Sequence, residues 1–433
     1  MELLANTESE AASCSVSFET WTGSRSLATI GTNAGSLAIP FQNWRTFKEA
    51  FAPELIQRAI SETGDVATIF DPFGGSGTTA LAGQFLGARP TTIEVNPFLA
   101  DLIAAKVARY DFDELSDCYA KVRKEAFHGD VDPLVFMQDA PPTFLEPGVN
   151  ERFLFSRALA GRFFAYRKAI EGLTDVNIRR LFLVLLCGFS VAISNARVSG
   201  KGRRYRSNWQ TRQSDPNVVD VEFEKSALNA IKDLRQFENR SCTDFRVLRG
   251  DARELVHSVT DQDLSVFSPP YPNSFDYTDV YNIELWMGGY LRSGTDNRNL
   301  RMNTLRSHVQ INRNLDFSTS NSLTLRTTLD RLSESKSELW SPRLPGMVGA
   351  YFHDMVEIMA GLRKAIRPGG RVYMVVGDSR YAGVDVPVAK ILSELVPDNG
   401  FDVLLNEPFR SMRASPQQGG KQVLAETLIV LRG

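Results

Sequence analysis

The chain alternates short apolar runs with longer segments whose apolar residues recur at helical spacing. Runs at 67–70, 90–95, 245–249, 264–267 and 371–376 predict buried strands. Two later runs, 401–405 and 427–431, predict an antiparallel pair at one edge of the sheet. This pattern predicts a doubly wound α/β fold on a mostly parallel sheet of about seven strands.

The pattern also divides the chain into segments. Residues 1–40 are rich in Ser, Thr, Gly and Ala, which predicts a loosely ordered arm with a strand near Trp21. Residues 41–110 and 244–433 carry the α/β pattern, whereas 111–243 predicts a helical insertion. Within the last segment, about 290–349 is polar and basic with few periodic apolar residues, so we expect a long insertion facing the substrate. A helix over 351–366 is expected to follow it.

Composition narrows the possible classes of protein. The 433 residues carry a net charge of −2, so any nucleic-acid contact must come from local patches. Four scattered cysteines and four histidines indicate neither a disulfide framework nor a metal site. The most apolar stretch, 181–193, is shorter than a membrane span, and 1–13 has no basic residue as a signal peptide would. We therefore expect a cytoplasmic protein without a membrane partner.

A glycine-rich turn follows the first predicted strand and opens a helix over about 78–86. It reads Asp71-Pro72-Phe73-Gly74-Gly75-Ser76-Gly77-Thr78-Thr79. Such a turn lets the backbone approach a ligand closely, and the free N–H groups of the helix favour an anionic group. No Lys follows Gly77, which disfavours a triphosphate. Glu94 lies about 20 residues further on, where an acid can accept hydrogen bonds from ribose hydroxyls. The pair predicts a site for a nucleoside-bearing cofactor; a tight turn without a ligand is the alternative.

A second motif, Ser268-Pro269-Pro270-Tyr271, ends the apolar run 264–267. Two consecutive prolines have no N–H to donate, so the strand must stop there, at the end where open α/β sheets bind ligands. The Ser268 hydroxyl and the Pro269 carbonyl can accept hydrogen bonds from an amino group, and Tyr271 can stack on a flat heterocycle. The motif therefore predicts a site for the exocyclic amine of a nucleobase, with a merely proline-terminated strand as the alternative.

Further candidates flank these motifs. Asp251 ends the predicted strand 245–249 on the same side and can accept from an adenine amino group. The aromatics between 275 and 281 fit either a wall for a base or the core face of a helix. One stretch has no acidic residue and contains Arg197, Lys201, Arg203, Arg204 and Arg206. We expect it to form a loop that contacts the phosphates of a nucleic acid, with a merely solvated loop as the alternative.

These motifs resemble those of S-adenosylmethionine-dependent DNA amino-methyltransferases, which methylate N4 of cytosine or N6 of adenine. The resemblance covers about 44–106 and 245–290, and the final third less sharply; the two insertions match nothing identifiable. The turn at 71–79 resembles the cofactor motif, and 51–55 resembles the motif that closes over the methionine part of the cofactor. The cofactor-binding residues implied are Phe51, Pro53, Asp71, Phe73, Gly74, Gly75, Ser76, Gly77, Thr78, Glu94, Asn96, Asp251 and Ala252, and the catalytic residues are Ser268, Pro269, Pro270 and Tyr271.

The resemblance implies a Rossmann-like fold, S-adenosylmethionine as cofactor, no metal, double-stranded DNA as partner and direct transfer to a flipped-out base. It also implies a restriction-modification or related defence role, with a cognate endonuclease as a candidate partner. Ser at the first catalytic position goes more often with N4 of cytosine, which we favour over N6 of adenine. Two other interpretations remain: an RNA or tRNA guanine-N2 methyltransferase, and a catalytically inactive DNA-binding protein.

Overall fold

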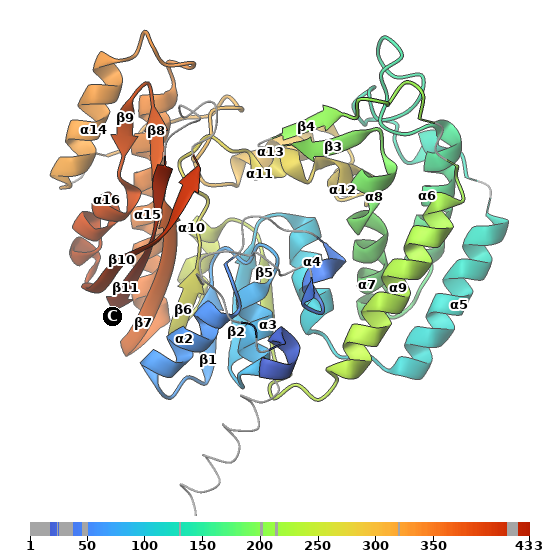
Figure 1. Cartoon of the computed structure of the whole chain (residues 1–433), viewed down its shortest axis with the longest axis horizontal. Helices are drawn as coiled ribbons and strands as arrows, with labels where there is room; N and C mark the ends of the chain where they lie inside the picture. The colour runs from blue at the N-terminus through green and yellow to red at the C-terminus, as the bar shows by residue number, and fades with distance from the viewer. Residues whose placement is uncertain are drawn as a thin grey trace, which may run out of the picture.

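A seven-stranded sheet forms the centre of the protein (Figure 1). The computed structural model describes residues 18–23, 25, 38–45, 51–129, 131–199, 202–212, 215–318, 321–413 and 423–433. The sheet contains, in spatial order, β10 (Asp402–Arg413), β11 (Val423–Arg432), β7 (Ile366–Gly377), β6 (Gln262–Phe267), β1 (Thr68–Asp71), β2 (Arg89–Glu94) and β5 (Arg246–Arg249).

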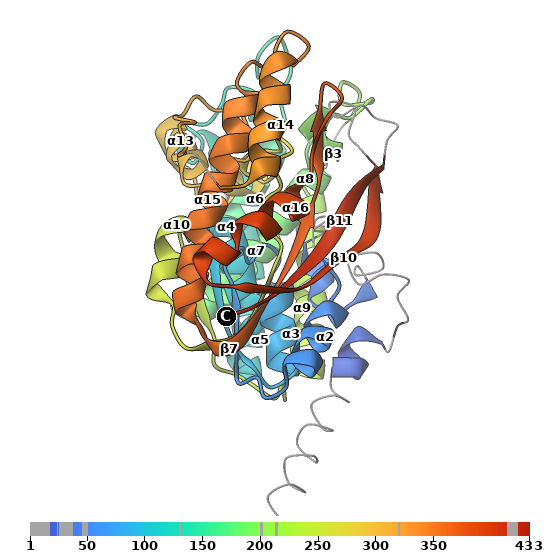
Figure 2. The ribbon, with the colours of Figure 1, turned by 90° about the vertical axis from the view of Figure 1, so that its left-hand side faces the viewer.

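The strand directions confirm the predicted Rossmann-like architecture. From β5 to β7 all neighbours are parallel, and β11 runs antiparallel to both β7 and β10. The expected antiparallel pair is thus present. Of its two strands, β10 forms one edge of the sheet, and β11 lies between β10 and β7 (Figure 2). The chain moves outward from β1 to β2 and β5 and then returns to β6 on the other side. The strand order therefore reverses between β1 and β6, where open α/β sheets bind ligands.

Helices cover both faces of the sheet because successive strand residues point to opposite sides. In β7, Tyr373 and Val375 join the hydrophobic cluster that contains α2 (Glu54–Thr63) and α3 (Thr78–Phe85). The alternating residues Val372 and Met374 join the opposite cluster. That second cluster includes residues of α10 (Ala252–Leu255), α15 (Leu344–Ala365) and α16 (Val388–Leu395).

The helical insertion shares its core with one face of the sheet. Its helices are α5 (Phe112–His128), α6 (Arg157–Glu171), α7 (Val176–Gly188), α8 (Ser190–Ile193) and α9 (Val218–Gln236). Their buried residues belong to the same cluster as α2 and α3, and α7 packs on α4 (Pro97–Val107). By length and composition, the described segment Val176–Ile193 is apolar enough to cross a membrane, with a mean hydropathy of 1.8, but 56% of it is buried inside the protein.

The loop expected around Gly202 is instead an antiparallel hairpin of β3 (Ala196–Ser199) and β4 (Gly202–Tyr205). Ala196 is buried and Val198 packs against the core, whereas Arg197 between them is exposed. This period-two alternation is the signature of a strand, but over four residues it was too short to stand out.

The expected strand near Trp21 is wrong, because 18–22 form a helical turn. Trp21 is only 1% exposed, since its indole stacks on Phe85 at 4.5 Å between ring centroids and donates to the Pro40 carbonyl at 3.0 Å. Most of the predicted arm lies outside the described residues.

The insertion at 290–349 is more regular than expected. It contains α13 (Gly294–Met302) and α14 (Leu323–Glu334), and α15 begins at Leu344 rather than at 351. The earlier start follows from burial, because Leu344, Met347 and Val348 are fully buried on one face of the helix. Pro345 in its first turn is compatible with this start.

Candidate active site

A cavity of about 300 Å³ opens at the carboxyl ends of β1, β2, β5 and β6. All four predicted catalytic residues line it, as do all of the predicted cofactor residues except Pro53 and Gly77. Neither of those two lines the cavity. Pro53 directly precedes α2, and Gly77 directly precedes α3 with a φ of 81°. Motifs far apart in the sequence therefore meet in one cavity.

The glycine turn is packed too tightly for a side chain at Gly74. A Cβ at Gly74 would lie 2.2 Å from Thr92 Cγ2 and 2.7 Å from Ile103 Cδ1, so only glycine fits. The turn is also held from beneath by Lys106 of α4, whose fully buried ammonium donates to the Ser76 carbonyl at 2.8 Å. Burial lowers the pKa of Lys106 to about 7. No pattern in the sequence singles out this lysine.

Two buried carboxylates stand at the strand ends beside the turn. Glu94 accepts from the Gly75 N–H at 2.8 Å and from the Asn96 N–H at 2.7 Å, and Asp71 accepts from the Phe73 N–H at 2.8 Å. Burial raises the pKa of each acid to about 7, and the nearby Asp71 adds to the shift of Glu94. The buried Nδ2 of Asn96 has no hydrogen-bond partner among the described residues. The cavity thus offers acceptors and an unused donor to a ligand rich in hydroxyls.

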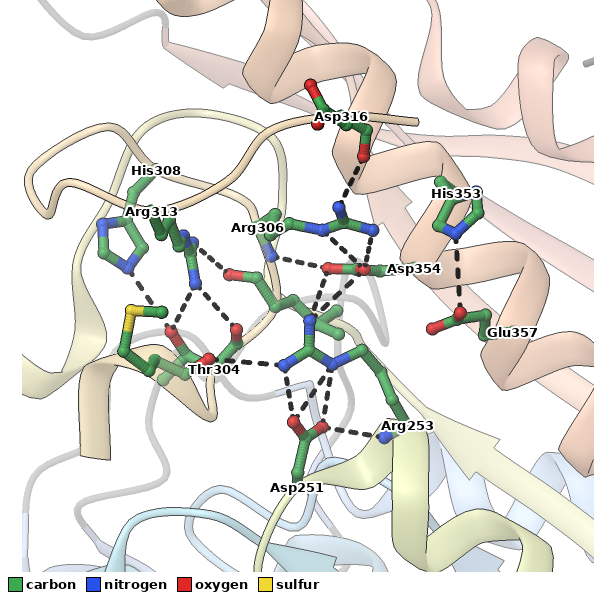
Figure 3. Close-up of polar contacts among 12 residues, drawn as sticks. Asp251, Arg253, Thr304, Arg306, His308, Arg313, Asp316, His353, Asp354 and Glu357 are labelled. Carbon is green, nitrogen blue, oxygen red and sulfur yellow. Dashed lines mark hydrogen bonds and ion pairs between the residues drawn. The ribbon is translucent and has the colours of Figure 1, made fainter. Parts of the chain in front are cut away.

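Asp251 lies at the start of α10 and forms an ion pair with Arg253 (Figure 3). Arg253 Nε lies 3.0 and 3.1 Å from the two carboxylate oxygens, and the Arg253 N–H also donates to Asp251 at 2.9 Å. The same guanidinium reaches Asp354 of α15 at 3.4 Å. Arg253 Nη2 also donates to Asp251, at 2.5 Å. Three N–H groups of Arg253 (backbone, Nε and Nη2) thus point at a carboxylate that has about four lone-pair directions, which leaves one for a ligand.

The motif Ser268-Pro269-Pro270-Tyr271 connects to a residue of β11 that the sequence analysis did not single out. Ser268 Oγ donates to Tyr271 Oη at 3.2 Å, and Tyr271 Oη donates to Glu426 of β11 at 2.9 Å. Burial and the neighbouring Glu426 carboxylate raise the pKa of Tyr271 well above 10. Glu426 is 5% exposed and lines the cavity. The available signal was a lone acid in the apolar run 423–432.

The aromatics after the motif divide between wall and core. Phe275 and Tyr277 line the cavity and meet edge to face, with centroids 4.5 Å apart. Tyr281 is 2% exposed and packs against Phe98 at 6.3 Å. Phe275 and Tyr277 thus lie in the cavity wall, and Tyr281 belongs to the core.

The predicted DNA-contacting residues fall into separate environments on the β3–β4 hairpin. Arg197 and Arg204 are exposed and lie directly opposite each other. Arg203 pairs at 3.1 Å with Asp279 of α11 (Tyr277–Val280), which places the hairpin beside the cavity wall. Arg206 instead donates to the carbonyls of Ser194 and Ala192, near the end of α8. Lys201 lies outside the described residues.

The basic insertion turns several arginines inward. Arg301 pairs with Asp276, Arg306 with Asp354, and Arg313 donates to the Leu305 carbonyl at 2.7 Å. The insertion contributes mostly polar, uncharged side chains to the cavity instead, from Asn303, Thr304, Leu305, Ser307 and His308.

Comparison with known proteins identifies relatives along nearly the whole chain. No family model matches the sequence. The type II methyltransferase M.BsoBI of Geobacillus stearothermophilus is 24% identical over 93% of this chain and 86% of its own. The type II methyltransferase M.AvaI of Nostoc sp. is 25% identical over 91% of this chain and 86% of its own. The curated homologues are type II methyltransferases.

The similarity to type II methyltransferases reaches beyond the motifs. The alignment with M.BsoBI omits only 7% of the chain (100% minus 93%), fewer residues than either insertion holds, so each insertion lies at least partly within it. Among solved structures, TrmN from Thermus thermophilus overlaps with a TM-score of 0.30 and 11% identity, over 90% of this chain and 52% of that one. A TM-score this low supports no conclusion about the fold, which rests on the strand order instead.

Proposed function

We propose that the protein is a site-specific DNA methyltransferase, which transfers a methyl group from S-adenosylmethionine to the exocyclic amine of a flipped-out base. N4 of cytosine is favoured over N6 of adenine. The observation that carries the proposal is that Ser268 and Tyr271 share one cavity with the glycine turn and Glu94. The type II methyltransferase relatives support the same class and a role in a restriction-modification system. The proposal includes a cognate endonuclease as partner.

The cavity residues fit this cofactor. Glu94 offers carboxylate acceptors to ribose hydroxyls, and Asn96 offers the unused Nδ2 donor. Asp251 is placed to accept from an adenine amino group, and Phe51 lies on the wall near the glycine turn. S-adenosylmethionine supplies a methyl group on a sulfonium, which an amine lone pair can attack directly to leave a thioether. No nucleophilic side chain is required by this chemistry.

The remaining cavity residues fit a base. Removing a base from the duplex costs a few kcal/mol, and stacking on Tyr271 offsets about 1–3 kcal/mol of it. Ser268 Oγ and the Pro269 carbonyl accept hydrogen bonds from the amine, which directs its lone pair away from them. The methylated nitrogen then releases one proton. Catalysis here is positioning and electrostatics.

Mass spectrometry of nucleosides tests the proposal, after DNA is incubated with the protein and labelled S-adenosylmethionine. We expect labelled N4-methylcytosine. Labelled N6-methyladenine would keep the enzyme class and overturn the choice of base. Label in RNA alone would favour a guanine-N2 methyltransferase, and label in neither nucleic acid would overturn the proposal.

A Ser268→Ala variant tests the assigned role of the hydroxyl. We expect turnover to fall by about 100-fold, the scale of removing one oriented hydrogen-bonding group from an active site. Cofactor affinity, measured by calorimetry, should stay within about threefold of wild type, a difference below about 0.7 kcal/mol. A comparable loss of cofactor affinity would contradict the role.

A further inference from the structure

We infer that Glu426 is a positioning residue for methyl transfer, because it fixes the direction in which the Ser268 hydroxyl points. This inference rests on the proposed function and adds a residue from β11, a strand that carries none of the recognised motifs. Its effect passes through Tyr271, so Glu426 acts without touching the target amine.

The three side chains form a directional chain. The Tyr271 hydroxyl lies 2.9 Å from Glu426 Oε1 and 3.2 Å from Ser268 Oγ. An ionised carboxylate can only accept hydrogen bonds, so Tyr271 must give its single proton to Glu426. Tyr271 Oη is then free only to accept, and Ser268 donates to it.

The direction of this chain matters for the reaction. A serine hydroxyl has one proton and two lone pairs. Once the Ser268 proton is committed to Tyr271, the lone pairs are what the oxygen can offer to the cavity, and an amine N–H needs an acceptor. Without the carboxylate, Ser268 could rotate its proton toward the amine nitrogen and occupy the lone pair that must attack the methyl group. Glu426 thereby favours the productive arrangement.

The surroundings keep the chain in place. Tyr271 keeps its proton at neutral pH because burial and the Glu426 carboxylate raise its pKa. Glu426 is 5% exposed, and hydrogen bonds are stronger where water is excluded. Its backbone is fixed by pairing with Gly377 at the end of β7. A strand of the central sheet holds a side chain more firmly than a loop does.

The residue type itself points to function. Burying a carboxylate costs free energy that an apolar side chain in the same strand would avoid. The neighbours Leu424, Leu428 and Val430 show that β11 is otherwise built for burial. An acid kept there, at the cavity wall and on the catalytic tyrosine, breaks the local pattern where a functional site is expected to do so.

Single-turnover methylation by the full-length protein tests this inference, with saturating DNA and S-adenosylmethionine. Glu426→Gln should lower the rate of methyl transfer by about 100-fold while the dissociation constants for DNA and cofactor stay within about threefold. Tyr271→Phe keeps the stacking ring but breaks the chain in the middle, so it should cause a similar loss. The double variant should lose no more of the methyl-transfer rate than either single variant, because both substitutions remove the same interaction.

Glu407→Gln serves as the matched control. Glu407 lies on the neighbouring strand β10, is 40% exposed and pairs with Arg58, so its loss removes the same charge from outside the cavity. This control should methylate at the wild-type rate. Should Glu426→Gln fail to fold, the loss in Tyr271→Phe still reports on the chain.

The outcomes separate this inference from the proposed function. A wild-type protein that methylates DNA, together with a Glu426→Gln variant of equal rate, would overturn the role of Glu426 alone. Multiplicative losses in the double variant, or a loss confined to binding, would overturn it as well. A wild-type protein that transfers no methyl group would overturn the proposed function, and this inference with it.

Discussion

At the scale of single residues, two buried carboxylates of the cavity wall have pKa values shifted by burial. Glu94 and Asp71 are both buried, and burial raises the pKa of each to about 7. The folded protein therefore binds protons more tightly at these sites than the unfolded chain does. Their contribution to stability is largest below the unfolded pKa, and it is lost as the pH rises through about 7.

Glu94→Gln makes this linkage measurable. The glutamine cannot titrate, so the free energy of unfolding of the variant lacks this contribution. Raising the pH from about 5.5 to about 8 should destabilise wild type by about 2 kcal/mol more than the variant, given a pKa of about 7 in the folded protein and an ordinary glutamate pKa of 4.5 in the unfolded chain. Urea unfolding at both pH values provides the comparison. Equal pH dependence of the two proteins would contradict the raised pKa of Glu94.

The same proton should control cofactor binding. Ribose hydroxyls donate to the ionised form of Glu94, so the affinity for S-adenosylmethionine should rise as the pH increases through about 7. Below that pH it should fall by up to about tenfold per pH unit. Calorimetric titration across pH 5.5–8.5 measures the effect. A flat profile in wild type, or an unchanged profile in Glu94→Gln, would remove Glu94 from the binding site.

A site residue could be predicted when the residues that define its role are its neighbours in the sequence. Ser268 to Tyr271 and the glycine turn are continuous runs at strand ends, so their residue types alone indicated a site. Glu426 is 155 residues from Tyr271, and Lys106 is 30 residues from Ser76. Their roles depend on which strands and helices become neighbours in the fold. No local pattern carries that information.

At the scale of elements, the β3–β4 hairpin is the best-placed basic surface. Arg197 and Arg204 are exposed and lie opposite each other, and neither side chain makes a hydrogen bond or ion pair with another described residue. Like charges directly opposite on a sheet repel, so an anion between them would relieve the repulsion. Arg203 ties the hairpin to α11 at the cavity wall through Asp279.

Replacing both exposed arginines with glutamine should therefore weaken DNA binding. The slope of log affinity against log salt should decrease by about 1.8, since each phosphate contact contributes about 0.9. Fluorescence anisotropy at several salt concentrations measures the slope. Arg206→Gln is the comparison, because Arg206 bonds the carbonyls of Ser194 and Ala192 and should affect stability more than the slope. An unchanged slope in the double variant would place DNA elsewhere.

Elements marked by consecutive or periodic apolar residues were predicted, and elements that depend on tertiary contacts were not. The parallel strands and α3 followed from such residues, although β1 and β5 have only four residues each. The strands β3 and β4 are equally short but contain no two consecutive apolar residues. The first turn of α15 is marked by burial against residues distant in sequence. The insertion at 290–349 looked irregular because arginines that pair internally are indistinguishable in sequence from arginines exposed to a substrate.

At the scale of the whole molecule, one buried carboxylate joins three distant segments. Asp354 of α15 is fully buried and accepts from the backbone N–H and Nε of Arg306, each at 2.8 Å (Figure 3). It also accepts from Arg253, which grips Asp251. The end of β5, the insertion and α15 are thus linked through a single acid, beside the part of the cavity lined by 303–308.

This link should transmit cofactor binding to the insertion. In wild type, S-adenosylmethionine should slow amide hydrogen exchange across 303–313, because ordering Asp251 also orders Arg253 and, through Asp354, Arg306. Asp354→Asn leaves two arginines without their buried counter-charge and should destabilise the protein by about 3–5 kcal/mol. Its 303–313 segment should then exchange at a rate independent of cofactor, at concentrations that saturate the site.

Glu357→Gln is the matched control, one helical turn further along α15. Glu357 is 47% exposed and lies 3.5 Å from His353, outside the chain that joins Asp251 to Arg306. This variant should keep both the stability and the cofactor-dependent protection of wild type. If Asp354→Asn folds and retains that protection, the insertion must sense the cofactor through direct cavity contacts such as Thr304. Loss of protection in Asp354→Asn, but not in Glu357→Gln, would instead show that the Asp354 carboxylate couples cofactor binding at Asp251 to the segment 303–313.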